Sequence, residues 1–159
     1  MKLQVMQAKL IAWLFHLGQK DLGGTPYFEH CKFVAKEARF IGSRFTECEE
    51  ILDKIEVLGY LHDILEDTRI PLWLLSCLFS DETVIDIRTL TRTKGSHYLN
   101  YIRQCSTSIN TAIVKLADVN HNLDTTRLPE NWKAKKTLYN RMKKYVEARL
   151  ILLDSLDKR

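Results

Sequence analysis

The most constraining feature of this sequence is the spacing of its apolar residues, which recur every three or four positions along most of the chain. That period places apolar side chains on one face of a helix, whereas the strict alternation typical of a half-buried strand is rare and short here. A chain of 159 residues, of which 45% are hydrophobic, is long enough to bury one full core. We therefore expect an all-α helical bundle that forms a single domain over residues 1–159.

Glycine, proline and capping residues indicate where the expected helices begin and end. The expected helices cover 3–17, 27–40, 47–67 after a Thr46 cap, 71–79, 82–90, 97–104, 107–124 and 129–156. Two polar stretches, at 18–26 and 91–96, read as connectors that contain glycine.

The sequence shows no sign of export or of a membrane segment. Its longest apolar runs, such as residues 150–153, are far shorter than the roughly 20 residues that cross a bilayer. The first residues lead into an amphipathic stretch rather than a signal peptide. The cysteines at positions 31, 48, 77 and 105 form no Cys-x-x-Cys pair, so we expect reduced, mostly buried thiols. These features predict a cytoplasmic protein.

Charge is unevenly distributed along the chain. The formal net charge is +4, with −2 carried by residues 1–80 and +6 by residues 81–159. This asymmetry suits an anionic partner such as a phosphorylated small molecule, because nucleic acid usually requires a stronger and more continuous basic face. The last expected helix has a basic run, which we interpret mainly as a solvated surface. Its residues are Lys133, Lys135, Lys136, Arg141, Lys143, Lys144 and Arg149.

Four polar side chains lie in the otherwise apolar segment 61–67, which reads LHDILED. Helical spacing puts His62 one turn from Glu66, and Asp63 one turn from Asp67, so all four can reach one cavity. A neighbouring imidazole and carboxylate suit a divalent metal such as manganese, iron or zinc, and further carboxylates can move protons. The alternative is that the acidic pair only ends the helix, which the helix dipole disfavours.

A metal ion needs more than two protein ligands. The best further candidates are His30, in the second expected helix, and Asp118, in an otherwise apolar run. An aspartate is rarely buried without a partner, which favours a ligand role for Asp118. On composition alone, His16, His97 and His121 remain alternatives.

Three segments of this chain resemble the HD-domain metal-dependent phosphohydrolases. They read AxxxHxGQ at 12–19 followed by GTPYxxH at 24–30, LHDxxEDT at 61–68, and VKLADxxHNL at 114–123. Within that superfamily the sequence is most similar to the hydrolase domain of the RelA/SpoT homologues and to the small alarmone hydrolases. A His-Asp pair alone is a weak signal, but the combination of the three segments is specific.

The resemblance implies a single divalent cation, most often manganese, with iron, zinc or magnesium as alternatives. The implied ligands are His30, His62, Asp63 and Asp118. The implied reaction removes the 3′-pyrophosphate from guanosine tetraphosphate or pentaphosphate and leaves GDP or GTP.

The resemblance also implies roles for the neighbouring polar residues. Glu66 and Asp67 are expected to position and activate the attacking water and to manage its proton. Asn122 and Thr125 match positions that contact the nucleoside part of the substrate.

Two departures from the family pattern keep other functions open. Asp21-Leu22 stands where the family commonly has Arg-Lys, and Asp124 replaces a usual Arg. A second hypothesis is therefore an HD phosphohydrolase that acts on another nucleotide, such as a nucleoside monophosphate or NADPH. A third is a non-catalytic module that senses nucleotides. The cations available to compensate are Lys20, Arg92, Lys94, Arg127, Lys135 and Lys136.

Overall fold

The computed structural model describes residues 2–130 and 136–159, and these residues form helices joined by turns. The elements are α1 (Lys2–Phe15), α2 (Tyr27–Gly42), α3 (Glu49–Leu61), α4 (Ile64–Asp67), α5 (Leu72–Leu78), α6 (Asp81–Leu90), α7 (Tyr98–Cys105), α8 (Ile109–Leu123), the 3-10 turn η1 (Thr125–Arg127) and α10 (Lys136–Asp157). No strand occurs within these residues, so the expected all-α class is confirmed.

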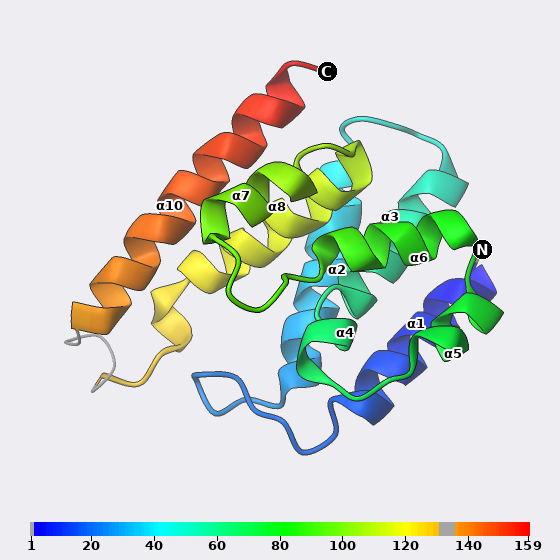
Figure 1. Ribbon diagram of the computed structural model, residues 1–159, viewed down its shortest axis with the longest axis horizontal. Coiled ribbons are helices and arrows are strands. Elements are labelled where there is room, and N and C mark those ends of the chain that lie inside the picture. Colours follow the sequence, from blue (N-terminus) through cyan, green and yellow to red (C-terminus); the bar gives the residue numbers. More distant parts are fainter. Residues whose placement is uncertain (1, 131–135) are drawn as a thin grey trace.

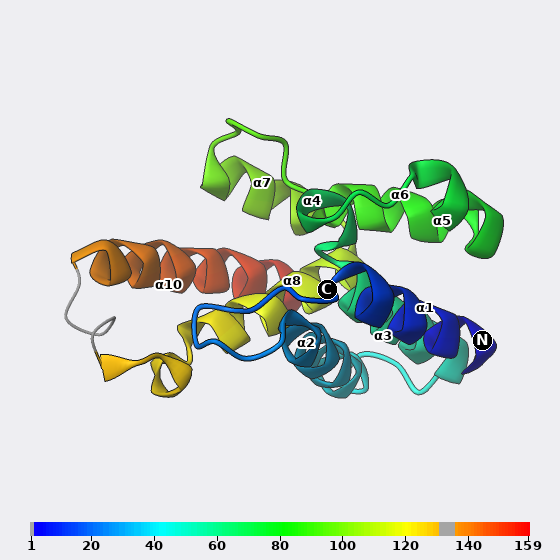
Figure 2. The ribbon, with the colours of Figure 1, turned by 90° about the horizontal axis from the view of Figure 1, so that it is seen from below.

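The helices are arranged around α2, α3 and α8 (Figure 1). Helix α2 packs against both α3 and α8, while α1 lies on α3 and α10 lies along α8. In the view of Figure 2, α4, α5, α6 and α7 lie together on one side of the molecule, and the remaining helices lie on the other. The connection from α3 to α4 passes between these two groups, and it contains the His62-Asp63 pair.

The centre of the bundle is apolar, and the polar residues of interest project from within it. Cys31 and Val34 on α2, Leu58 on α3, and Val114 and Ala117 on α8 are all fully buried. Because burial of apolar surface is the main favourable contribution to folding, this packing fixes the backbones of the three central helices. Polar side chains that project from these backbones are therefore held in defined positions.

The helix expected over 47–67 is interrupted in the structure. Helix α3 begins after Cys48 rather than Thr46 and ends at Leu61, and α4 begins at Ile64. Between them Asp63 has φ −106° and ψ 3°, in a sparsely populated region where many active-site residues are found. The interruption turns the chain, so that the acidic pair lies in a separate short helix instead of one turn further along α3.

A close contact between α2 and α3 lies just before this interruption. A Cβ atom at Gly59 would lie 2.4 Å from the Cα atom of Ala35, so only glycine allows the two helices to approach this closely. The carbonyl of Gly59 also accepts a hydrogen bond from Nδ1 of His62, at 2.8 Å. The glycine therefore brings His62 close to α2.

Two other expectations can be compared with the structure. All four cysteines are free, as expected, but Cys48 and Cys77 are exposed, so only half of the thiols belong to the core. In the part of the chain that is described, no helix is both long enough and apolar enough to cross a membrane. The basic residues Lys133 and Lys135 lie outside the described residues.

Candidate metal centre and active site

The side chains proposed as metal ligands come from three separate parts of the bundle. His30 projects from α2, Asp118 from α8, and His62 and Asp63 from the turn between α3 and α4. His30, His62 and Asp118 are buried, and each offers a ligand atom within 4.8 Å of the other two. The packing of α2, α3 and α8 thus brings together residues that are up to 88 positions apart in the sequence.

The spacing of the donor atoms fits a divalent cation. Nε2 of His30 lies 3.2 Å from Nε2 of His62 and 3.3 Å from Oδ1 of Asp118. Nε2 of His62 lies 2.8 Å from Oδ2 of Asp63. Donor atoms about 2.1 Å from an octahedral ion, at right angles to each other, are about 3 Å apart. His62 donates from Nδ1 to the carbonyl of Gly59, which leaves Nε2 as the ligand atom when the ring is neutral.

The electrostatics of His30 and Asp118 favour positive charge between the carboxylates of Asp63 and Asp118. Burial alone would lower the pKa of His30, but hydrogen bonds to Asp118 and Asp63 outweigh it and raise this pKa to about 9. Burial would raise the pKa of Asp118, yet Lys115 and the two histidines lower it below its ordinary value. The amine of Lys115 lies 2.7 Å from Oδ2 of Asp118. Without a cation, protons on imidazole balance the buried carboxylates.

Glu66 and Asp67 lie beside this cluster. Both line a narrow cavity of about 180 Å³, whose wall also includes Asp63 and Asp118. Oε2 of Glu66 accepts a hydrogen bond from the backbone N–H of Arg92, at 3.0 Å. Partial burial, with Asp63 and Glu66 nearby, raises the pKa of Asp67. A carboxyl group with a raised pKa is suited to proton transfer near neutral pH.

Tyr27 contacts both Asp67 of the acidic pair and the set of proposed metal ligands His30, His62, Asp63 and Asp118, which we call the metal cluster. The sequence analysis assigns no role to this residue. Its hydroxyl donates to Oδ2 of Asp63 at 2.5 Å, and it lies near enough to Asp67 to lower that carboxyl's pKa by hydrogen bonding. The GTPY segment contains this tyrosine, but no sequence pattern indicates which side chain it contacts. The contact fixes one oxygen of Asp63.

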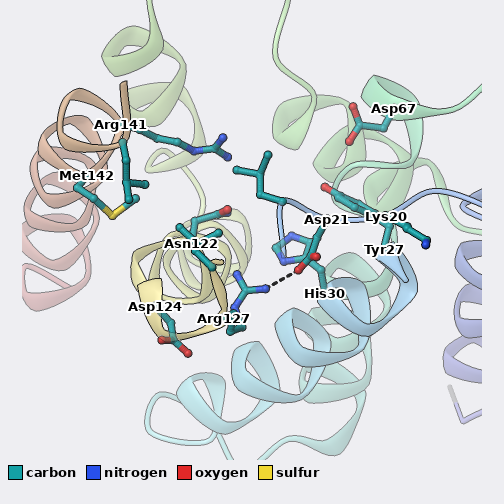
Figure 3. A pocket seen from close by; sticks show the side chains of 13 residues that line it. Lys20, Asp21, Tyr27, His30, Asp67, Asn122, Asp124, Arg127, Arg141 and Met142 are labelled. Carbon is teal, nitrogen blue, oxygen red and sulfur yellow. Dashed lines mark hydrogen bonds and ion pairs between the residues drawn. The ribbon is translucent and has the colours of Figure 1, made fainter. Parts of the chain in front are cut away.

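A second, wider cavity of about 280 Å³ adjoins the first, and the two share Tyr27, Asp67, Asn122 and Arg141 (Figure 3). Asn122 donates from Nδ2 to Oδ1 of Asp118 at 2.5 Å, so this predicted substrate residue touches the metal cluster. Thr125 is half-buried in η1 and is not among the residues that line the wide cavity. The apolar part of the wall consists of Leu22, Leu128, Leu138 and Met142.

Besides Lys115, which is paired with Asp118, the narrow cavity is lined by the cations Arg92, Arg141 and Lys144. Aromatic rings hold them: Lys144 Nζ lies 4.5 Å from the centre of the Tyr98 ring, and Arg92 lies over the same ring. Burial and the two neighbouring arginines lower the pKa of Lys144. The interpretation of the basic run as mainly a solvated surface holds for Lys136, Lys143 and Arg149, which are exposed, but not for Arg141 and Lys144, which are half-buried.

Asp21 and Asp124, which depart from the family pattern, each form polar contacts with another residue of the chain. Oδ2 of Asp21 lies 2.6 Å from Nη1 of Arg127, in an ion pair that spans 106 residues of sequence (Figure 3). Asp124 accepts hydrogen bonds from the backbone N–H and the hydroxyl of Thr126, at 3.0 and 2.6 Å. Arg127, one of the cations available to compensate for the missing Arg-Lys pair, is thus paired with a carboxylate. Lys135, another of those cations, lies outside the described residues.

The alternative histidines lie at different distances from the cluster. His16 is buried, contacts Gln19 through Nδ1 at 2.7 Å, and packs against the ring of Tyr27. His97 is exposed and precedes α7. His121 touches His30 on the side of the ring that faces away from the other ligands, with 2.7 Å between the two Nδ1 atoms.

Two known proteins with similar sequences carry the name of the same enzyme. The chain is 26% identical over 132 residues to the probable guanosine-3′,5′-bis(diphosphate) 3′-pyrophosphohydrolase of Synechocystis sp.; the match covers 76% of this chain and 16% of that protein. It is 30% identical over 139 residues to the guanosine-3′,5′-bis(diphosphate) 3′-pyrophosphohydrolase of Borreliella burgdorferi, with 80% of this chain and 20% of that protein covered. The chain therefore spans a fifth or less of the length of these curated relatives. No protein-family model matches the sequence.

A solved structure of a metazoan ortholog of SpoT, described as hydrolysing ppGpp, has the same fold. It superposes with a TM-score of 0.70 and 23% sequence identity, and the match covers 96% of this chain and 85% of that one. The arrangement of helices around the cluster is therefore shared with a chain of similar size.

The geometry of the cluster predicts that a divalent cation stabilises the folded protein. At a free concentration 100 times the Kd, binding only to the folded state contributes about 2.7 kcal/mol. For a domain of this size, that corresponds to a rise in Tm of about 5–10 °C. Chelator-treated protein should be melted in a fluorimeter while Mn²⁺, Zn²⁺ or Mg²⁺ is titrated, with Asp118→Asn as the variant that lacks one ligand. A wild-type Tm that no cation changes would contradict the centre.

Proposed function

Because this chain belongs to the HD-domain family of the RelA/SpoT hydrolases, we propose that it is a metal-dependent hydrolase of guanosine 3′-pyrophosphates. The proposed reaction adds water to guanosine tetraphosphate or pentaphosphate and releases pyrophosphate together with GDP or GTP. One observation carries the proposal: buried His30, His62 and Asp118 converge beside a cavity that Glu66 and Asp67 also line. The substrate is a cellular nucleotide, so we place the reaction in the cytoplasm.

His30, His62, Asp63 and Asp118 are the proposed ligands of the cation, which we take to be manganese. A divalent ion held there would lower the pKa of water from about 15.7 towards 7 and neutralise phosphoryl charge. The chain's own contribution at this point is to orient the donor atoms. The carbonyl of Gly59 fixes His62, and the hydroxyl of Tyr27 fixes Asp63.

Glu66 and Asp67 are proposed to move the protons. In the reaction, the oxygen of water bonds to the phosphorus attached to the ribose 3′ oxygen, and the bond between that phosphorus and the 3′ oxygen breaks. Water loses a proton, and the 3′ oxygen gains one. The backbone N–H of Arg92 orients Glu66, which would accept the proton from water. Asp67, whose pKa is raised by partial burial and by its acidic neighbours, suits the donation.

The cations that line the narrow cavity are proposed to bind an anionic substrate close to the acidic pair. Arg92, Arg141 and Lys144 face the same narrow space as the two carboxylates. A pyrophosphate group bound between these cations and the metal cluster would have its charge compensated on both sides, which is the main contribution a protein makes to phosphoryl transfer. The nucleoside would then extend into the wide cavity, beside Asn122. Thr125, the other residue predicted to contact the nucleoside, follows Asn122 in the turn η1 and does not line this cavity.

One observation favours the second candidate, a hydrolase of the same type that acts on another nucleotide. In the wide cavity, Arg127 is held in an ion pair with Asp21, and Lys20 and Arg141 are the other cations that line it. A pocket of this kind depends less on charge and more on the apolar wall to hold a base. The non-catalytic module differs from both candidates in predicting binding without turnover.

The proposed reaction predicts release of pyrophosphate from guanosine tetraphosphate by the purified, Mn²⁺-loaded protein. Products should be separated by ion exchange and compared across a panel that includes nucleoside monophosphates and NADPH. The first candidate predicts guanosine 3′-pyrophosphates well ahead of the other substrates, because their leaving pyrophosphate matches the cation cluster. Turnover confined to another nucleotide would favour the second candidate, and binding without turnover under several metals would favour the module.

Glu66→Gln separates catalysis from metal binding. The substitution keeps the size of the side chain but removes the proton acceptor, so we expect kcat to fall by about 10²–10⁴-fold. Metal content, measured by atomic emission, should remain that of the wild type because Glu66 is not among the proposed ligands. Glu50→Gln, at an exposed position of α3, is the matched control and should retain full activity. If metal is lost together with activity in Glu66→Gln, the division of roles is wrong.

Lys144→Ala, compared with Lys143→Ala, tests whether the cations that line the narrow cavity bind the substrate. Lys144 lines the narrow cavity, whereas Lys143 is exposed on the same helix and carries the same charge. Removal of a charge-assisted contact to phosphate weakens binding, so we expect KM for guanosine tetraphosphate to rise about tenfold in Lys144→Ala. Lys143→Ala should have the wild-type KM. Equal effects in the two variants would show that only the overall charge of α10 matters.

A further inference from the structure

His121 is a buried residue of α8 that lies next to the proposed metal ligand His30. The two Nδ1 atoms are 2.7 Å apart, and the ring centroids are separated by 4.8 Å. The other face of His121 packs on the ring of Phe33, with centroids 4.2 Å apart and an interplanar angle of 30°. His121 therefore has a fixed orientation and one ring nitrogen committed to His30.

The hydrogen bond between these two rings determines which nitrogen of His30 carries a proton. A bond between two imidazole nitrogens requires one N–H and one lone pair. Nε2 of His30 faces His62 and Asp118, so it can offer a lone pair to a cation only if the proton of the neutral ring is on Nδ1. In that state His30 donates from Nδ1, and His121 must accept with its own Nδ1.

The position of His121 is supported from a second direction. Nη2 of Arg127 donates to the backbone carbonyl of His121 at 3.0 Å, while Nη1 of the same guanidinium is paired with Asp21. Three successive contacts thus connect the loop before α2 with the ring of His30. This arrangement holds the end of α8 and leaves little freedom for the acceptor atom.

We propose that His121 is a positioning residue for the metal centre: its Nδ1 accepts the hydrogen bond from Nδ1–H of His30 and so directs Nε2 of His30 towards the cation. The inference rests on the metal centre of the proposed function, but not on the identity of the substrate. His62 obtains the equivalent support from the carbonyl of Gly59. A side chain on α8 therefore supplies for His30 what a backbone carbonyl supplies for His62. Partners of this kind change metal affinity by about 10–100-fold.

The test compares variants that do and do not preserve the acceptor. In His121→Asn, the amide oxygen can take the place of Nδ1, whereas His121→Leu removes the acceptor. His121→Gln moves the polar group to the position of Nε2 and repeats the comparison with a polar residue. Binding of Mn²⁺ to metal-free protein should be measured by calorimetry without nucleotide. We expect the Kd to rise about 10–100-fold in the Leu and Gln variants and to stay within about threefold in His121→Asn.

The Tm of each metal-free variant separates positioning from a purely structural role. A structural role predicts that metal affinity falls in step with the metal-free Tm, whichever residue replaces His121. Wild-type affinity in His121→Leu and His121→Gln, or affinity in His121→Asn as weak as in those two, would overturn the proposal. If wild-type protein binds no cation, both the centre and this role of His121 are wrong. Binding of metal without hydrolysis of any nucleotide would refute the proposed function but leave the test of His121 intact.

Discussion

The structure depends on the compensation of two buried carboxylates. Asp118 is buried and Asp63 is largely buried near the centre of the bundle, where an unpaired charge is strongly unfavourable. Two imidazoles and the amine of Lys115 face them, so α2, α3 and α8 must meet at this point for the charge to be balanced. With the turn after α3, Asp63 meets the hydroxyl of Tyr27 and Nε2 of His62.

This arrangement brings groups of opposite charge to one cavity. The narrow cavity is lined by Asp63 and Asp118, by the acidic pair, and by cations that include Arg92, Arg141 and Lys144. Aromatic rings pack against those cations, which limits their motion without neutralising them as a carboxylate would. In the proposed reaction, an anionic substrate in this cavity would lie close to both the cations and the proposed metal ligands before any bond breaks.

The sequence predicted the helical class because apolar periodicity is a local property. It also indicated His62 and Asp63, because polar residues in an apolar helix require a reason to be there. The structure brings His30 and Asp118 to the same place, although their spacing in the chain could not show it. The interruption of α3, and the inward position of Arg141 and Lys144 on a helix that reads as basic surface, depend on tertiary contacts. His121 was considered only as an alternative ligand, since no sequence pattern shows which face of His30 it would meet.

Asp21 stands where the family commonly has a cation, and this difference changes the contacts within the site as well as its charge. With a cation at that position, Arg127 would face a like charge and would lose its carboxylate partner. With Asp21, the guanidinium is held between the loop before α2 and the carbonyl of His121, 2.6 Å from one and 3.0 Å from the other. A series of contacts through Arg127 and His121 therefore connects Asp21, in the wall of the wide cavity, with the ring of His30. In the proposed function, the charge that binds phosphate would come mainly from Arg141 and Lys144 of α10 and from Arg92 before α7.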